Sequence, residues 1–115
     1  MDDIIDLSVE IKLDGLVVTN TTIGRTGLTT ADSRLNEIGA GGLSGKPLTA
    51  RSTEVVSYLS QQTKQQLPIM ASGGIFTGAD AKEKLNAGAA LVQVWTGFIY
   101  EGPMIVKNIC KNLAE

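Results

Sequence analysis

The chain has 115 residues, enough for one small domain, and its hydrophobic fraction of 43% with a charged fraction of 19% suits a packed α/β protein and excludes a disordered chain. The net charge of −2 gives no general attraction to nucleic acid, so no nucleic-acid partner is expected. With no histidine and one cysteine, the sequence excludes a His-based triad, a histidine metal site and an internal disulfide.

The first half of the chain is expected to hold one helix, one strand and a long loop. Residues Asp2 to Lys12 predict a helix, although their helical period is imperfect. Leu16-Val17-Val18 predicts a short buried strand that ends at Thr19-Asn20-Thr21-Thr22. The stretch from Ile23 to about Pro47 holds six glycines and predicts a loop. A loop of this length is unusual unless it acts as a lid or a binding loop.

The second half alternates helices with strands. Two apolar strands run into glycine turns, at Leu67–Gly74 and Ala90–Gly97. Three helices are expected at Ser52 to Gln66, Ala79 to Ala87 and Met104 to Leu113, with a turn from Phe98 to Pro103. A strand, a helix of about ten residues and a second strand form a βαβ unit, which implies parallel strands.

This order of elements predicts the α/β class, and in particular about three βα units of a (β/α)₈ TIM barrel. Three strands cannot close a barrel, which usually needs ~250 residues. The chain also starts inside a predicted helix with no strand before it. We therefore interpret residues 1–115 as the C-terminal part of a longer barrel domain, incomplete as a barrel by itself.

The glycine turns after the two apolar strands predict a phosphate site. Successive glycines in Ser72-Gly73-Gly74-Ile75 let backbone N–H groups converge on an anion, and a helix N-terminus near Thr77 adds partial positive charge. Taken alone, a Gly-Gly pair favours an ordinary strand-to-helix turn over a phosphate site. A second such turn at Trp95-Thr96-Gly97 favours phosphate, because loops after the last barrel strands commonly bind it.

Other residues have both a functional and an ordinary explanation. Thr19 to Thr22 can hydrogen-bond a planar heterocycle or form a polar turn that caps the strand. Trp95 is a candidate to pack against a cofactor or to fill the core. For Lys46 and Cys110 we favour the ordinary explanation, a surface lysine and a packing residue.

Together these segments resemble dihydroorotate dehydrogenase, and the class 2, quinone-dependent form in particular. The matching stretches cover nearly the whole chain in order: Asp14–Thr22, Gly41–Leu48, Ser72–Ile75 and Gly88–Gly97, continuing through Glu101-Gly102-Pro103. The Thr-Asn-Thr-Thr segment and the Gly-Pro after the last strand look like class 2, which argues against a class 1-type enzyme.

The resemblance implies an FMN-binding TIM barrel that oxidises dihydroorotate to orotate in pyrimidine biosynthesis, with a quinone as electron acceptor. It places Thr19 against FMN, and Asn20 with Thr21 on the pyrimidine substrate. It places Gly45, Gly74, Trp95 and Thr96 at the FMN site, the last three near the phosphate. The family commonly has tyrosine at the position of Trp95.

The same resemblance limits what this chain is expected to do alone. The family's catalytic serine base, a flavin-contacting lysine and the quinone-tunnel helices precede the matched region, so no catalytic residue and no metal site is assigned here. We expect the 115 residues alone to be inactive. The full-length enzyme is expected on the cytoplasmic side of the inner membrane, as a peripheral protein.

Two alternatives remain beside the class 2 fragment. One is another FMN barrel, such as a class 1-type enzyme. The other is a non-catalytic, phosphate-binding half-barrel. In either case an open three-strand sheet exposes edges and a helical face, so we expect the chain to self-associate.

Overall fold

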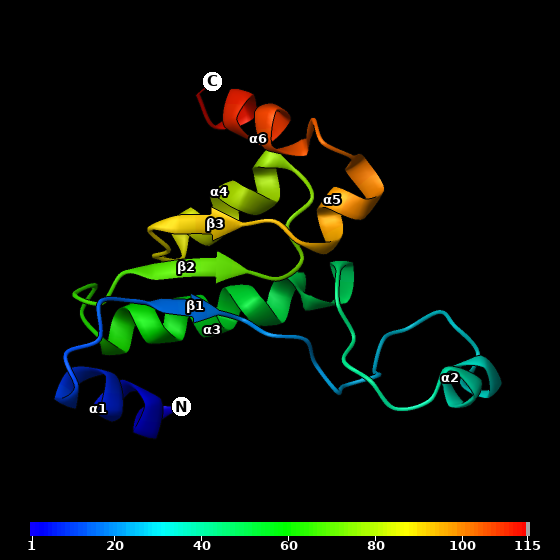
Figure 1. Cartoon of the computed structure of the whole chain (residues 1–115), viewed down its shortest axis with the longest axis horizontal. Helices are drawn as coiled ribbons and strands as arrows, with labels where there is room; N and C mark the ends of the chain where they lie inside the picture. The colour runs from blue at the N-terminus through cyan, green and yellow to red at the C-terminus, as the bar shows by residue number, and fades with distance from the viewer. Residues whose placement is uncertain (115) are drawn as a thin grey trace.

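The computed structural model describes residues 1–114 and contains a three-stranded parallel sheet with helices against one side of it (Figure 1). The strands lie in the order β1 (Leu16–Val18), β2 (Ile69–Ser72) and β3 (Leu91–Gln93). The helices are α1 (Asp2–Glu10), α2 (Asp32–Ile38), α3 (Thr49–Gln62), α4 (Gly78–Asn86), α5 (Thr96–Glu101) and α6 (Ile105–Ala114), with a 3₁₀ turn η1 (Lys46–Leu48) before α3. The predicted α/β class and parallel strands are confirmed.

The main core lies between the sheet and α3. Ile69 and Ala71 of β2 are 1% and 0% exposed, and they pack with Val56 and Leu59 of α3. Because side chains alternate along a strand, the paired residues Val17, Met70 and Leu91 face the other side. Val17 is 62% exposed and Leu91 is 58% exposed, so this second face of the sheet has no cover within residues 1–114.

A second, smaller core joins α4 to α6. Its buried residues are Ile75, Ala81, Ile105 and Ile109. Ile75 comes from the turn that follows β2, so this core also anchors the end of the central strand. The two cores therefore lie next to each other on the covered face of the sheet, one against α3 and one against α4 with α6, and Val92 of β3 packs against both (Figure 1).

Three predicted boundaries are wrong. The expected turn from Phe98 to Pro103 is instead helix α5 with a glycine C-cap at Gly102. The expected loop from Ile23 to Pro47 contains α2, whose seven residues bury no side chain, and part of η1. Helix α3 begins at Thr49, three residues before the expected start, and ends at Gln62.

The structure also tests the expectation for Cys110 and shows whether any helix could cross a membrane. Cys110 is exposed on α6, so its assignment as a packing residue is wrong. Within residues 1–114, each helix is too short or too polar to cross a lipid bilayer.

Candidate functional site

A cavity of about 360 Å³ lies at the carboxyl ends of the three strands, where parallel α/β sheets usually place their ligands. The structure brings together in its lining all seven residues that the sequence assigned to cofactor or substrate: Thr19, Asn20, Thr21, Gly45, Gly74, Trp95 and Thr96. These residues come from four separate segments of the chain: the end of β1, the loop before η1, the turn after β2 and the start of α5. Their convergence on one cavity is the main geometric result, and their individual roles stay predictions.

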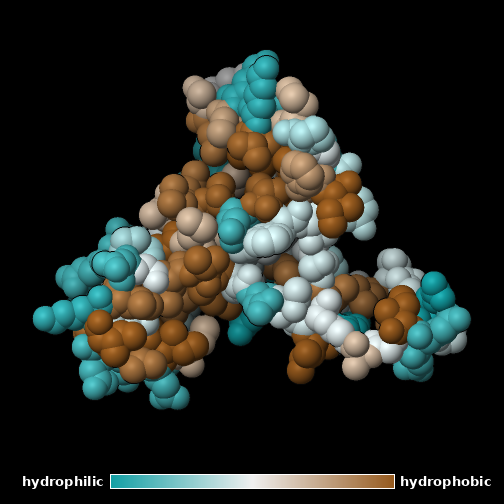
Figure 2. Space-filling view, in the orientation of Figure 1, coloured by the Kyte–Doolittle hydropathy of each residue, from teal (hydrophilic) through white to brown (hydrophobic). Residues whose placement is uncertain are grey.

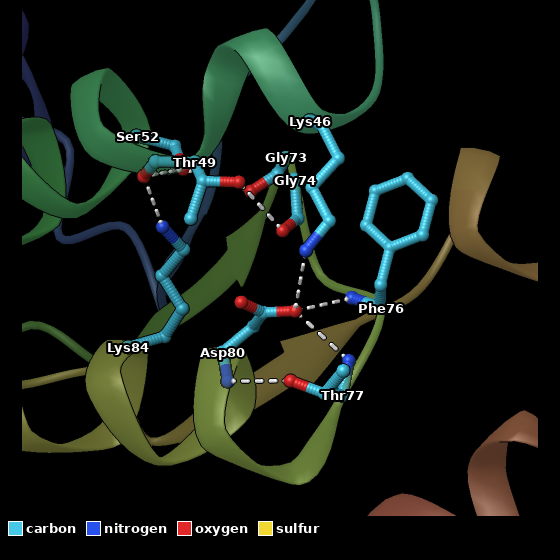
Figure 3. Close-up of polar contacts among 9 residues, drawn as sticks. All are labelled: Lys46, Thr49, Ser52, Gly73, Gly74, Phe76, Thr77, Asp80 and Lys84. Atoms are coloured by element: carbon cyan, nitrogen blue, oxygen red, sulfur yellow. Dashed lines mark hydrogen bonds and ion pairs between the residues drawn. The ribbon is translucent and has the colours of Figure 1, made fainter.

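The glycine turn after β2 is held tightly against the start of α3. Gly74 has a φ of +71°, which favours glycine, and a Cβ there would lie 2.6 Å from Cα of Thr49. The hydroxyl of Thr49 donates to the Gly74 carbonyl over 2.9 Å, and that of Ser52 donates to the Gly73 carbonyl over 2.8 Å (Figure 3). Because glycine has no Cβ, helix α3 can pack closely against one side of this turn.

Several residues that line the cavity have backbone donors with no partner in the part of the chain that the structure describes. The N–H groups of Gly74 and Ile75 find no acceptor within residues 1–114, and the same holds for those of Trp95 and Thr96. All four residues line the cavity. The start of α5 adds to this set, because the first N–H groups of a helix lack intrahelical acceptors. The two turns together can therefore donate several hydrogen bonds to one anion.

The loop before η1 closes the side of the cavity next to α5. Gly45 has a φ of +85°, and a Cβ there would lie 3.1 Å from Cγ2 of Thr96. The hydroxyl of Thr96 donates to Oγ of Ser44 over 3.0 Å. Trp95 itself is 69% exposed, which rules out the alternative that it fills the core.

The strand end after β1 supplies polar groups at the cavity rim. Oδ1 of Asn20 accepts the backbone N–H of Thr21 over 2.7 Å, so the Asn20 side chain forms the turn that the ordinary reading expected. Its amide NH₂ has no acceptor within residues 1–114, and Asn20 lines the cavity. The two readings of this segment are therefore compatible, because one atom shapes the turn and another offers donors.

The predicted role of the helix N-terminus near Thr77 is wrong. A carboxylate oxygen of Asp80 accepts the N–H groups of Phe76 and Thr77 over 3.0 and 2.9 Å, and the Thr77 hydroxyl accepts the Asp80 N–H (Figure 3). This capping box occupies the N–H groups of Phe76, Thr77 and Asp80, and none of these three residues lines the cavity. The positive end of α4 is neutralised by its own aspartate.

The same contacts set the charge of Asp80. Partial burial raises the pKa of Asp80, but hydrogen bonds from Phe76 and Thr77 and the nearby Lys46 outweigh it, so the pKa is lowered overall. Nζ of Lys46 lies 3.7 Å from Asp80 and 5.0 Å from the ring centroid of Phe76. Lys46 does not line the cavity, which agrees with its interpretation as a surface residue.

The described lining of the cavity carries no ionisable side chain. Beyond the seven predicted residues it includes hydroxyl, amide and apolar groups, among them Ser44, Ser72, Gln93 and Leu48. Sequence reasoning did not assign Gln93, whose only signal is a polar residue inside an otherwise apolar strand. Such a neutral lining is suited to binding by hydrogen bonds, and it offers no group of ordinary basicity for proton removal.

Comparison with known proteins supports the resemblance seen in the sequence. The family model described as dihydroorotate dehydrogenase matches residues 1–115. A protein of Christiangramia forsetii named dihydroorotate dehydrogenase (quinone) is 53% identical over 113 residues, which are 98% of this chain and 32% of that protein. One of Trichodesmium erythraeum with the same name is 52% identical over 97% of this chain and 31% of that protein.

Solved structures agree. The crystal structure of DHODH from Eimeria tenella in complex with ferulenol superposes with a TM-score of 0.87 at 46% identity, covering 96% of this chain and 29% of that chain. The open three-stranded sheet thus matches part of a (β/α)₈ barrel enzyme. The chain spans about a third of the length of the curated relatives above. The chain belongs to the dihydroorotate dehydrogenase family, and the relatives that it resembles are the quinone-dependent type.

Proposed function

We propose that this chain is the part of a flavin-dependent oxidoreductase that binds the phosphate of FMN and contacts a pyrimidine substrate. The observation that carries the proposal is that Gly74, Ile75, Trp95 and Thr96 all line one cavity and that their N–H groups have no acceptor within residues 1–114. Backbone donors at a glycine turn and at a helix start are the groups that proteins commonly use to bind phosphate. The names of the relatives add the reaction, oxidation of dihydroorotate with a quinone as acceptor.

The residues present fit FMN. Ligand cavities commonly measure about 300–1,000 Å³, and this one lies within that range at about 360 Å³. Its lining combines N–H donors for a dianion with the flat surface of Trp95 and the hydroxyl of Thr19 nearby. When bound, FMN supplies a two-electron acceptor for hydride from dihydroorotate.

The roles of this chain's own residues follow from where they lie. Gly74, Trp95 and Thr96 bind the phosphate through their backbone, and Gly45 lets the loop approach Thr96 closely enough to close the cavity. Asn20 and Thr21 orient the substrate, Asn20 by donating from its side-chain NH₂ to a carbonyl or carboxylate oxygen. Oxidation of a carbon acid also needs a positioned base, and the described lining has none.

The whole protein to which such a segment belongs is proposed to act at the cytoplasmic side of the inner membrane, where quinone is available. The domain assignment of residues 1–115 as the C-terminal part of an FMN-binding barrel is part of this proposal. It rests on the motif order and on the quinone enzymes among the relatives.

A titration of the purified chain with FMN tests the proposal. The sequence holds a single tryptophan, and Trp95 lines the cavity, so bound flavin should quench its fluorescence. FMN that binds only the folded chain must also raise the melting temperature. Riboflavin, which lacks the phosphate, is the matched control and should bind at least tenfold more weakly. Equal binding of both, or no change with either at millimolar concentration, contradicts a phosphate site in this cavity.

A second assay separates binding from turnover. Dihydroorotate-dependent reduction of a dye by the FMN-loaded chain should be undetectable, because the described cavity lacks a base. Measurable turnover would show that a group in this chain removes the proton. Binding of FMN without binding of orotate would favour the non-catalytic half-barrel among the alternatives.

A further inference from the structure

Two side chains of α3 fix the direction of the peptide groups in the glycine turn. Oγ of Ser52 donates to the Gly73 carbonyl over 2.8 Å, and Oγ1 of Thr49 donates to the Gly74 carbonyl over 2.9 Å (Figure 3). Ser52 is fully buried at 0% exposure, and Thr49 is half-buried. Neither residue lines the cavity, so both act from behind the turn.

Because the peptide group is planar, fixing the direction of a carbonyl also fixes the direction of the N–H group that follows it. In a planar trans peptide the C=O and N–H groups point in opposite directions. A Gly73 carbonyl held on α3 turns the Gly74 N–H away from α3, and a Gly74 carbonyl held on α3 does the same for the Ile75 N–H. These are two of the donors that line the cavity without an acceptor in residues 1–114.

The glycines make such a hold necessary. Gly73 and Gly74 have φ values of +106° and +71°, and glycine reaches either sign of φ with little cost. A turn built from two glycines therefore has no intrinsic preference strong enough to keep both N–H groups facing one way. The two hydroxyl contacts supply that preference.

A third residue, Lys84, holds the first turn of α3, from which both hydroxyl donors come. Lys84 of α4 is 0% exposed, and its Nζ donates to the Thr49 carbonyl over 2.5 Å (Figure 3). The same Nζ also donates to the Thr53 hydroxyl. Burial lowers the pKa of Lys84, which Glu83 and Asp80 partly offset. A buried ammonium group is costly unless it is well bonded, so this contact ties the first turn of α3 firmly to the helix that follows the glycine turn.

We propose that Thr49, Ser52 and Lys84 are positioning residues for the phosphate group: they set the Gly74 and Ile75 N–H groups toward the cavity before any ligand binds. The inference rests on the proposed function, since it assigns these two donors to the phosphate of FMN. None of the three residues touches the ligand. Preorganised donors bind an anion better than mobile ones, because no ordering is needed at the moment of binding.

A purely structural role for the same contacts makes a different prediction. If the hydroxyls only stabilise α3, their loss lowers the melting temperature and leaves the affinity of the folded chain for FMN unchanged. If the hydroxyls orient the donors, their loss weakens FMN binding more than a control substitution that lowers the melting temperature by the same amount. The dissociation constant and the melting temperature therefore separate the two roles.

The test uses pairs of variants of the full chain. Thr49→Val and Ser52→Ala remove one hydroxyl each, and Lys84→Met removes the ammonium group at similar length. Thr49→Ser keeps the hydroxyl and removes only the methyl group. Thr63→Val is the matched control, because the Thr63 hydroxyl is also buried but bonds the Leu59 carbonyl at the far end of α3. We expect Thr49→Val and Ser52→Ala to weaken FMN binding at least tenfold, while Thr49→Ser and Thr63→Val stay within threefold of the wild type.

A readout without FMN keeps this inference distinct from the proposed function. In heteronuclear NMR spectra, inorganic phosphate should shift the amide signals of Gly74 and Ile75 more than others, and Ser52→Ala should remove that response. If the wild type binds FMN and the variants bind it equally, the positioning role is wrong and the phosphate site stands. If FMN fails to bind but phosphate moves these two amides, the cofactor is wrong and the positioning role stands. If neither FMN nor phosphate shifts the amide signals of Gly74 and Ile75, the positioning role is overturned. If the Lys84→Met variant does not fold, the two hydroxyl variants decide the test.

Discussion

Thr49 lies directly against Gly74, with its hydroxyl 2.9 Å from the Gly74 carbonyl oxygen and its Cα 2.6 Å from where a Cβ on residue 74 would lie. Residue 74 must be glycine for two reasons that do not involve a ligand, the contact with Thr49 and a φ of +71°. A glycine after a strand predicts close approach, and here the approaching group on one side is the protein's own helix.

Gly74→Ala is expected to destabilise the fold by about 2–5 kcal/mol. Roughly 1–2 kcal/mol comes from placing an L-residue at this φ, and roughly 1–3 kcal/mol from overpacking against Thr49. The free energy of unfolding in urea measures the change. FMN binding should be lost as well, because relief of the clash moves the turn that carries the Gly74 and Ile75 N–H groups.

Gly102→Ala is the control for that experiment. Gly102 has nearly the same φ, +74°, but no atom lies within 4 Å of the position of its Cβ. This variant should cost only the conformational strain, roughly 1–2 kcal/mol. Equal destabilisation by the two variants would show that Thr49 does not crowd residue 74.

The cap of α4 gives a prediction about stability. The Thr77 hydroxyl accepts the Asp80 N–H over 3.2 Å, and the Asp80 carboxylate accepts two N–H groups in return. Thr77→Ala should lower the free energy of unfolding by about 1 kcal/mol, as is typical for the loss of an N-cap. Thr53→Ala is not a suitable control, because Lys84 bonds that hydroxyl, so an exposed threonine such as Thr30 is preferred.

The pH dependence of stability follows from the lowered pKa of Asp80. A carboxyl whose pKa is lower in the folded state stabilises the protein above its unfolded pKa of about 3.9, and that stabilisation is lost as pH falls through the folded value. Melting temperatures recorded from pH 7 to pH 2 should decrease once the pH is lower than about 4. Asp80→Asn should start less stable at pH 7 and show a shallower fall, and an unchanged slope would contradict this account.

Some of this fold could be predicted from the sequence, and the failures have physical reasons. The three strands were found because each is an apolar run that ends at glycine or small polar residues. The sequence does not reveal helix α5, because it is only six residues long, contains Gly97 in its first turn and is followed by Gly102. Helix α2 was missed because none of its residues is buried, so it shows no apolar face.

Ser52 has a different role in the structure from the local role that the sequence predicts for it. In Ser52-Thr53-Glu54 it was interpreted as the start of a helix, where serine commonly caps. The helix begins at Thr49, and the Ser52 hydroxyl instead bonds Gly73, 21 residues along the chain. The contacts from Thr49 to Gly74 and from Lys84 to Thr49 span 25 and 35 residues, so no local pattern reveals them.

The uncovered face of the sheet predicts self-association. Val17 and Leu91 are exposed on either side of Met70, and Figure 2 shows hydrophobic residues gathered over the strands on the face in view. Val17→Lys should reduce association of the 12.1 kDa chain in sedimentation experiments. Val9→Lys is the matched control, since Val9 on α1 is exposed to 66% against 62% for Val17. A monomeric wild type at high concentration would contradict the expectation.

Asn20 allows the substrate contact to be separated from the shape of the turn. Its Oδ1 accepts the Thr21 N–H over 2.7 Å, so only its NH₂ group remains to bind a substrate oxygen. Asn20→Asp keeps an oxygen for the turn and replaces the donor with an acceptor that repels the orotate carboxylate. In the FMN-loaded chain this variant should bind orotate at least tenfold more weakly, measured by the change in flavin absorbance, with FMN affinity unchanged.

Asn20→Ala removes both functions and should also lower the melting temperature. If Asn20→Asp binds orotate as the wild type does, the Asn20 side chain serves the turn alone.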